Sequence, residues 1–140
     1  MGRSYDNTGN VMLESVLNHL EALVSHDTRN PPRAITTGGI FDYIRVQLPD
    51  FAVEVTDHGA GAVSLFAVRG EPKRVFNVHL DTVPSSPAWT ADPLKLRVIG
   101  DRAIGLGACD IKGAAAALIA AAQSTQGDAA FLFTLSLIHI

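Results

Sequence analysis

A histidine and an aspartate that could bind a metal ion lie two residues apart at the end of an apolar run. Residues 75–84 read VFNVHLDTVP and place His79 and Asp81 near the end of a predicted strand. Because side chains alternate between the faces of a strand, these two share one face, about 6–7 Å apart. A neutral imidazole can bind a metal ion there, and the carboxylate can accept its second N–H. The position suits a site, because α/β sheets bind ligands at the carboxyl ends of their strands.

A second motif with an acidic residue follows at residues 105–113, which read GLGACDIKG. Gly105 and Gly107 permit a close approach of the backbone to a site. Asp110 stands where a helix is expected to begin and has two interpretations that can both hold. It can cap the helix, or its two oxygens can bridge two cations. One histidine near a strand end is usually a surface or core residue, but the two motifs together indicate half of a metal site.

Other residues with chemical potential have simpler interpretations. Cys109 has no base assigned to it and is expected to be a small buried thiol. Lys112 is expected to be a solvated or structural helix residue, and residues 29–31 a structural rim. Solvated positions are expected for His19, His26 and His58.

A nucleotide-binding domain is disfavoured by the same glycine-rich motif. In the dinucleotide fingerprint a third glycine follows Gly105 and Gly107, and Asp110 occupies that position. A carboxylate there would repel a pyrophosphate.

Helices and strands alternate along the chain. The predicted helices span residues 11–25, 39–48 and 110–123. The predicted strands span residues 51–56, 62–68, 75–80 and 129–134, and residues 94–104 are predicted to form a hairpin. This order predicts an α/β fold, a mixed sheet with helices on both faces.

Size and composition narrow the class of protein. The 140 residues fit one domain, and 47% of them are hydrophobic, which is enough for a core. The net charge of −3 comes without a basic stripe, so nucleic acid is not an expected partner. No apolar stretch is long enough to span a bilayer, and the polar N-terminal residues lack a signal-peptide core. These features predict a cytoplasmic protein with no membrane partner.

Three segments together resemble one enzyme family. Residues 77–84, Trp89 with residues 92–93, and residues 105–113 are similar to the metal-dependent aminoacylase and carboxypeptidase family. That family includes acetylornithine deacetylase and succinyl-diaminopimelate desuccinylase. The resemblance is greatest to its acetylornithine or acetylcitrulline deacetylase branch, which residues 27–32 (DTRNPP) also fit. It implies a partial di-zinc exopeptidase-like catalytic domain.

The resemblance also implies roles for the motif residues. His79 would bind one metal ion, Asp110 would bridge two, and Asp81 would orient His79 as an active-site residue. The implied metal is zinc, two ions per complete site, with cobalt able to substitute. The implied reaction is hydrolysis of an N-acyl amino acid, in arginine biosynthesis, by a metal-bound water of lowered pKa. A homodimer is compatible with the full-length protein.

The chain departs from the family pattern after residue 134. The family places two adjacent glutamates there, a general base and a metal ligand, whereas residues 135–140 read LSLIHI and no glutamate follows Glu71. We expect residues 1–134 to be the N-terminal part of a metallohydrolase catalytic domain and residues 135–140 to be an atypical tail from truncation or a frameshift. Because a general base contributes about 10²–10⁴-fold, the fragment alone is expected to be inactive or nearly so. The alternative hypothesis is a non-catalytic binding domain that retains a partial metal site.

Overall fold

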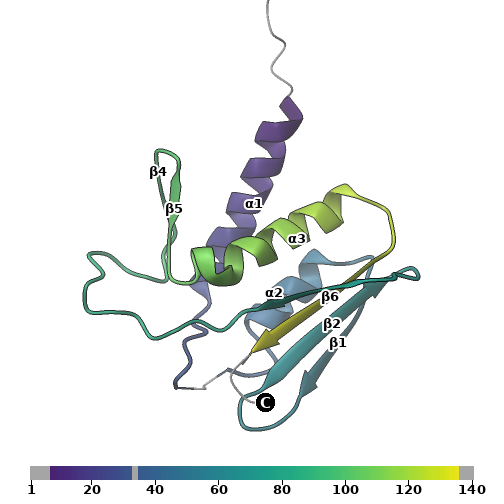
Figure 1. Ribbon diagram of the computed structural model, residues 1–140, viewed down its shortest axis with the longest axis horizontal. Coiled ribbons are helices and arrows are strands. Elements are labelled where there is room, and N and C mark those ends of the chain that lie inside the picture. Colours follow the sequence, from purple (N-terminus) through teal and green to yellow (C-terminus); the bar gives the residue numbers. More distant parts are fainter. Residues whose placement is uncertain (1–6, 33–34, 136–140) are drawn as a thin grey trace, which may run out of the picture.

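The computed structural model describes residues 7–32 and 35–135. These residues form three helices, a four-stranded sheet and a separate two-stranded hairpin (Figure 1). The helices are α1 (Asn7–Ser25), α2 (Ile40–Gln47) and α3 (Gly113–Ser124). The strands are β1 (Ala52–Asp57), β2 (Val63–Arg69), β3 (Val75–His79), β4 (Arg97–Ile99), β5 (Arg102–Ile104) and β6 (Ala129–Leu135). Every predicted element is present; α1 begins four residues earlier than expected, and α3 begins three residues later.

The main sheet has the strand order β1-β2-β6-β3. β2 pairs antiparallel with both β1 and β6, whereas β3 and β6 are parallel. Parallel strands need a long crossover connection, and the segment that holds the β4–β5 hairpin and α3 supplies it. The α/β fold with a mixed sheet is therefore confirmed.

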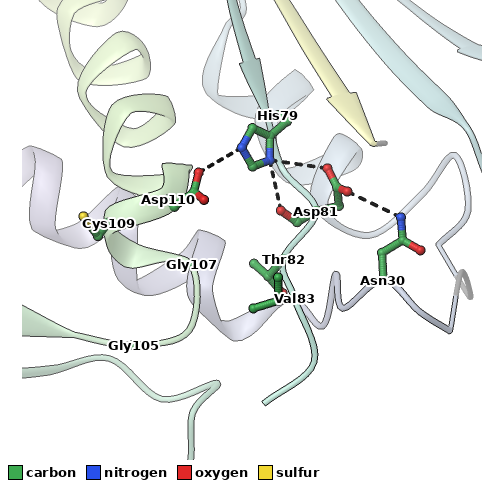
Figure 2. A pocket seen from close by; sticks show the side chains of 9 residues that line it. All are labelled: Asn30, His79, Asp81, Thr82, Val83, Gly105, Gly107, Cys109 and Asp110. Atoms are coloured by element: carbon green, nitrogen blue, oxygen red, sulfur yellow. Dashed lines mark hydrogen bonds and ion pairs between the residues drawn. The ribbon is translucent and has the colours of Figure 1, made fainter. Parts of the chain in front are cut away.

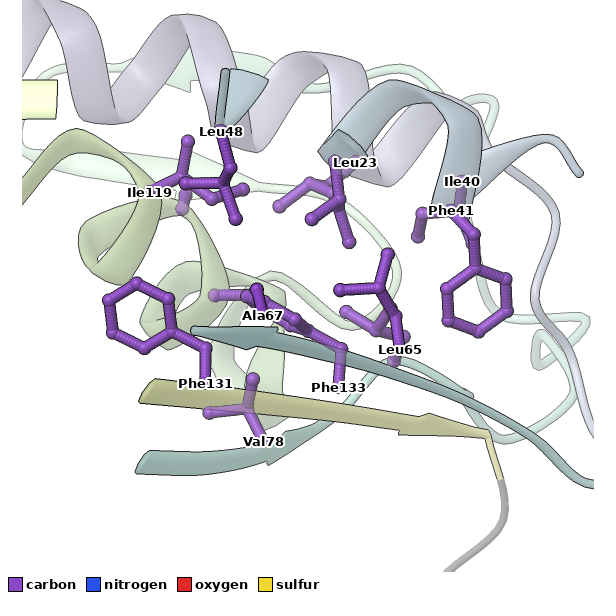
Figure 3. Close-up of a cluster of buried hydrophobic side chains, with 14 of the residues drawn as sticks. Leu23, Ile40, Phe41, Leu48, Leu65, Ala67, Val78, Ile119, Phe131 and Phe133 are labelled. Atoms are coloured by element: carbon purple, nitrogen blue, oxygen red, sulfur yellow. The ribbon is translucent and has the colours of Figure 1, made fainter. Parts of the chain in front are cut away.

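One face of the sheet carries the hydrophobic core (Figure 3). Leu65 of β2 and Val78 of β3 both lie opposite Phe133 of the central strand β6. The helices pack against this face through fully buried side chains: Leu23, Val24, Phe41, Ile44, Ala115, Ala116 and Ile119. The small alanine side chains of α3 let it pack closely against α1 and the sheet.

The other face of the sheet is less covered. Phe66, which points to that face, is 38% exposed, and its partner Leu132 is half-buried. In the described residues the helices thus cover one face, not both as predicted. The prediction failed because β2 and β6 carry apolar residues on both of their faces, so the sequence alone does not show which face of the sheet is less covered.

A polar cluster joins the three helices away from the sheet. The His19 ring is 7% exposed, so the prediction that it is solvated is wrong. Its Nε2 is 2.9 Å from Oε1 of Gln123, which can only accept, so Nε2 donates and Nδ1 accepts from the Tyr43 hydroxyl at 2.7 Å. Burial raises the pKa of Tyr43 above its ordinary value.

The end of the described chain continues the sheet. Leu135, the first residue of the predicted atypical tail, belongs to β6 and pairs with Val63 of β2. The rest of that predicted tail, residues 136–140, lies outside the described residues. None of the described helices combines the length and apolar character needed to cross a membrane.

Candidate metal site

His79 ends β3, and its ring lies between two carboxylates (Figure 2). The Nδ1 atom is 3.1 Å from the backbone oxygen of Asp81 and 3.4 Å from its Oδ1. The Nε2 atom is 3.0 Å from Oδ1 of Asp110. In a neutral ring that donates from Nδ1 to Asp81, the Nε2 lone pair faces Asp110. The structure therefore brings the three predicted site residues together.

Asp81 is a buried carboxylate with few partners. The residue is 8% exposed, and its Oδ1 has no hydrogen-bond partner among the described residues beyond the 3.4 Å approach of His79. Asn30 donates from Nδ2 to its Oδ2 at 3.4 Å. A cation on Nε2 would polarise the imidazole and strengthen the donor that Nδ1 offers to this carboxylate. The orphaned oxygen thus suits a histidine that binds metal.

Asp110 lies in a kinked turn, Ala108–Lys112, which we call the Asp110 turn. Its own backbone is extended, with φ −122° and ψ 88°, and its side chain is 85% exposed. α3 begins only at Gly113, and no side chain caps it. The N-cap interpretation of Asp110 is therefore wrong, because its carboxylate points to His79 and not to the helix.

The Asp110 turn depends on the glycine before it. Gly107 has a φ of 75°, and a Cβ on it would collide with Cγ2 of Thr82. Gly107→Ala is expected to lower the free energy of unfolding by about 1–2 kcal/mol for the left-handed backbone. Overpacking against Thr82 should add about 1–3 kcal/mol. Urea unfolding followed by circular dichroism measures the loss.

Gly100→Ala is the matched control for this prediction. Gly100 also has a positive φ, 61°, but nothing lies within 4 Å of the point where its Cβ would stand, so only the backbone penalty applies. Equal losses for the two variants would show that Gly107 does not approach Thr82 as closely as the structure places it.

The donor atoms fit zinc as half of a site. Imidazole nitrogen and carboxylate oxygen are both zinc ligands, and two donors about 2.1 Å from one tetrahedral ion lie about 3.4 Å apart. The observed separation of Nε2 and Oδ1 is 3.0 Å. Among the described residues no cluster of three or more histidine, cysteine, aspartate or glutamate side chains could hold an ion. A catalytic zinc has three protein ligands, so further ligands would have to come from outside this part of the chain.

Cys109 does not join these donors. Its side chain points away from His79 in Figure 2, and the residue is exposed, so the prediction of a buried thiol is wrong. In this turn it is Ile111, and not Cys109, that packs against the hydrophobic core.

An open pocket lies beside the three residues. Its volume is about 460 Å³, within the range of pockets that hold small molecules. Besides His79, Asp81 and Asp110 it is lined by Asn30, Thr82, Val83, Gly105, Gly107 and Cys109. The pocket joins the two sequence motifs with Asn30, which the sequence indicated only as a structural rim.

Residues 28–30 pair with the chain that follows β3. The backbone N–H of Thr82 donates to the Thr28 oxygen at 2.9 Å, and that of Asn30 donates to the Thr82 oxygen at 2.8 Å. The buried Thr28 hydroxyl donates to the backbone oxygen of Leu80 at 2.6 Å. Sequence reasoning missed this role of Thr28, because a bridge between segments fifty residues apart leaves no local pattern.

Lys112 is the last residue of the Asp110 turn and is 1% exposed. Its Nζ donates to the backbone oxygen of His26 at 3.0 Å. Burial lowers the pKa of Lys112 to about 8, and the charge of Asp27 acts against that shift. Hydrogen bonds from Arg29 in turn lower the pKa of Asp27 below its ordinary value. The structural interpretation of Lys112 fits this geometry, and the solvated one is wrong.

The segment that carries both motifs of the site matches a known family of hydrolases. Residues 75–136 match Peptidase family M20/M25/M40, so this segment is identified as part of a domain of that family. The described fold also superposes on human carnosine dipeptidase 1 with a TM-score of 0.72 at 18% sequence identity, over 89% of this chain and 32% of that chain.

Two curated relatives are similar to this chain over most of its length. The chain is 71% identical to N-acetyl-L-citrulline deacetylase of Xanthomonas campestris pv. campestris over 124 residues, which cover 88% of this chain and 34% of the relative. It is 41% identical to succinyl-diaminopimelate desuccinylase of Sphingopyxis alaskensis over 73% of this chain and 29% of the relative. The chain thus spans about a third of the length of these relatives.

Proposed function

We propose that this chain contributes one half of the metal centre of a hydrolase that removes the acyl group from an N-acyl amino acid. The observation that carries the proposal is the convergence of His79 Nε2 and Asp110 Oδ1, which lie 3.0 Å apart although the two residues are 31 positions apart in sequence. The similarity to N-acetyl-L-citrulline deacetylase supports the class of substrate.

Each residue has a proposed role in that centre. His79 would bind one metal ion through Nε2, and Asp110, whose side chain is open to solvent, would be shared between two ions. Asp81 holds the imidazole in the tautomer that donates from Nδ1. In this half of the metal centre it is the proposed catalytic residue. When bound, zinc lowers the pKa of a water molecule and polarises the amide carbonyl of the substrate. The pocket beside His79 then receives the acyl group or the amino acid.

The setting of the reaction is also a proposal. Residues 1–134 form the N-terminal part of the catalytic domain, and the metal is zinc, for which cobalt can substitute. The partner is a small N-acyl amino acid of arginine biosynthesis in the cytoplasm, and a homodimer is compatible with the full-length enzyme. The support is the activity that names the Xanthomonas relative, whose substrate is an N-acetyl amino acid.

A chimaera tests the proposed activity. In it, the 124 matching residues of the Xanthomonas deacetylase are replaced by those of this chain. The chimaera is expected to release acetate from N-acetylcitrulline with a kcat/KM close to that of the parent enzyme, because the replaced part keeps its donors. An assay for the free amine measures the rate. A folded chimaera that binds zinc but releases no acetate from N-acyl amino acids would contradict the proposal and favour a non-catalytic binding domain.

A further inference from the structure

The two segments that carry the proposed metal ligands are joined by a third segment, which carries no metal ligand itself. His79 comes from β3 and Asp110 from the turn before α3, and neither segment pairs with the other through backbone hydrogen bonds among those described. Residues 26–30, which follow α1, contact both of them. We call these residues the brace.

At one end the brace is fixed to the strand that carries His79. Thr28 receives the Thr82 N–H and donates its hydroxyl to the Leu80 oxygen, directly after His79. Thr28 is 1% exposed, so water cannot replace either bond. The position of residues 80–82, and with it the direction of the His79 ring, is therefore tied to the brace.

At the other end the brace is fixed to the Asp110 turn. Lys112 reaches His26 with its ammonium group at 3.0 Å, while its backbone N–H donates to the Gly107 oxygen at 2.8 Å. The carbonyl of His26 lies just after the C-terminal end of α1, where backbone oxygens lack helical partners and attract a cation. One buried side chain thus links the turn to the brace.

We propose that Lys112 is a positioning residue, which sets the separation of Asp110 and His79 by tethering the Asp110 turn to the brace. The inference rests on the proposed function, because it concerns the affinity of the metal half-site. Lys112 is not among the residues that line the pocket, and its ammonium group donates to the brace and not to His79 or Asp110, so it acts through the two segments that it joins.

A zinc titration of the 140-residue chain tests this role. Zinc alone is the probe, and binding is followed by the amide resonances of residues 107–112 and the ring resonances of His79, so that zinc bound elsewhere is distinguished. Lys112→Met keeps the length and apolar stem of the side chain but removes its donors and charge. It is expected to raise the zinc dissociation constant by about 10–100-fold, the usual effect of losing a partner outside the ligand set.

Two controls separate tethering from charge and from general stability. Lys73→Met makes the same change at an exposed position and should leave the zinc dissociation constant unchanged. Ile44→Val trims the core of α2 and is expected to lower stability by about 0.5–1.5 kcal/mol without changing zinc affinity. The His79 ring ¹⁵N shifts of the zinc-free chain should change in Lys112→Met and stay constant in both controls, because they report the contact with Asp110.

Two further variants decide between the inference and the function on which it rests. Thr28→Val removes the hydroxyl bond to Leu80 at the other end of the brace and should also weaken zinc binding, which keeps the test valid if Lys112→Met does not fold. His79→Ala should abolish the site-specific shifts. Zinc binding that survives His79→Ala would overturn the proposed function. Binding lost in His79→Ala but unchanged in the folded brace variants would overturn the positioning role alone.

Discussion

Replacing His79 with alanine is expected to lower the kcat/KM of the chimaeric deacetylase by about 10³-fold or more. The substitution removes the Nε2 donor that faces Asp110 at 3.0 Å and leaves the buried Asp81 without its imidazole partner. A metal that polarises a carbonyl supplies several kcal/mol of transition-state stabilisation, and each tenfold in rate corresponds to about 1.4 kcal/mol. Steady-state hydrolysis of N-acetylcitrulline by the purified variant measures the loss.

His58→Ala is the matched control for this prediction. His58 is an exposed histidine in the turn between β1 and β2, where its ring contacts the Ser64 hydroxyl. Its removal should leave kcat/KM unchanged, since it lies outside the pocket. Similar rates for the His79 variant and the parent chimaera would show that this histidine takes no part in the reaction.

The largest expected effect on stability comes from Phe133→Ala. Phe133 is fully buried in the central strand β6, opposite Leu65 and Val78, and its ring centroid lies 6.2 Å from that of Phe131. Truncation leaves a cavity that strands on both sides cannot fill, and the expected loss is about 3–5 kcal/mol in the free energy of unfolding. Urea unfolding of the 140-residue chain, followed by circular dichroism, gives this value.

Phe76→Ala makes the same chemical change on the edge strand β3. Phe76 is 54% exposed, so its truncation creates no enclosed cavity and should cost less than half as much. A Phe133 variant no less stable than the Phe76 variant would mean that the core does not lie on the helix-covered face of the sheet.

Local patterns in the sequence predicted the strand half of the site. The alternation along residues 75–81 put His79 and Asp81 on one face and Val78 and Leu80 on the other, and the structure buries Val78 and Leu80 in the core. This inference succeeds because the period of a strand is a property of its own backbone. The order of helices and strands predicted the α/β class for the same reason.

The turn half of the site depends on contacts that no local pattern reveals. An aspartate before an alanine-rich helix has the composition of an N-cap, yet the kink at Asp110 and Ile111 delays the helix to Gly113 and turns the carboxylate to His79. Lys112 resembles a solvated helix residue, but the end of α1, far away in sequence, supplies the carbonyl that lets it be buried. Propensities describe one segment at a time, whereas these positions are set by two segments meeting.

The most direct test of the metal site is the zinc content of the chimaera and of its Asp110→Ala variant, measured by inductively coupled plasma mass spectrometry after dialysis. We expect about two zinc ions per polypeptide in the chimaera and a clear loss of zinc in the variant, because Asp110 is proposed to bridge both ions. Asp101→Ala, at the exposed tip of the β4–β5 hairpin, should retain the zinc content of the parent. An unchanged zinc content in a folded Asp110→Ala variant would contradict the proposal that His79 and Asp110 form half of the metal centre.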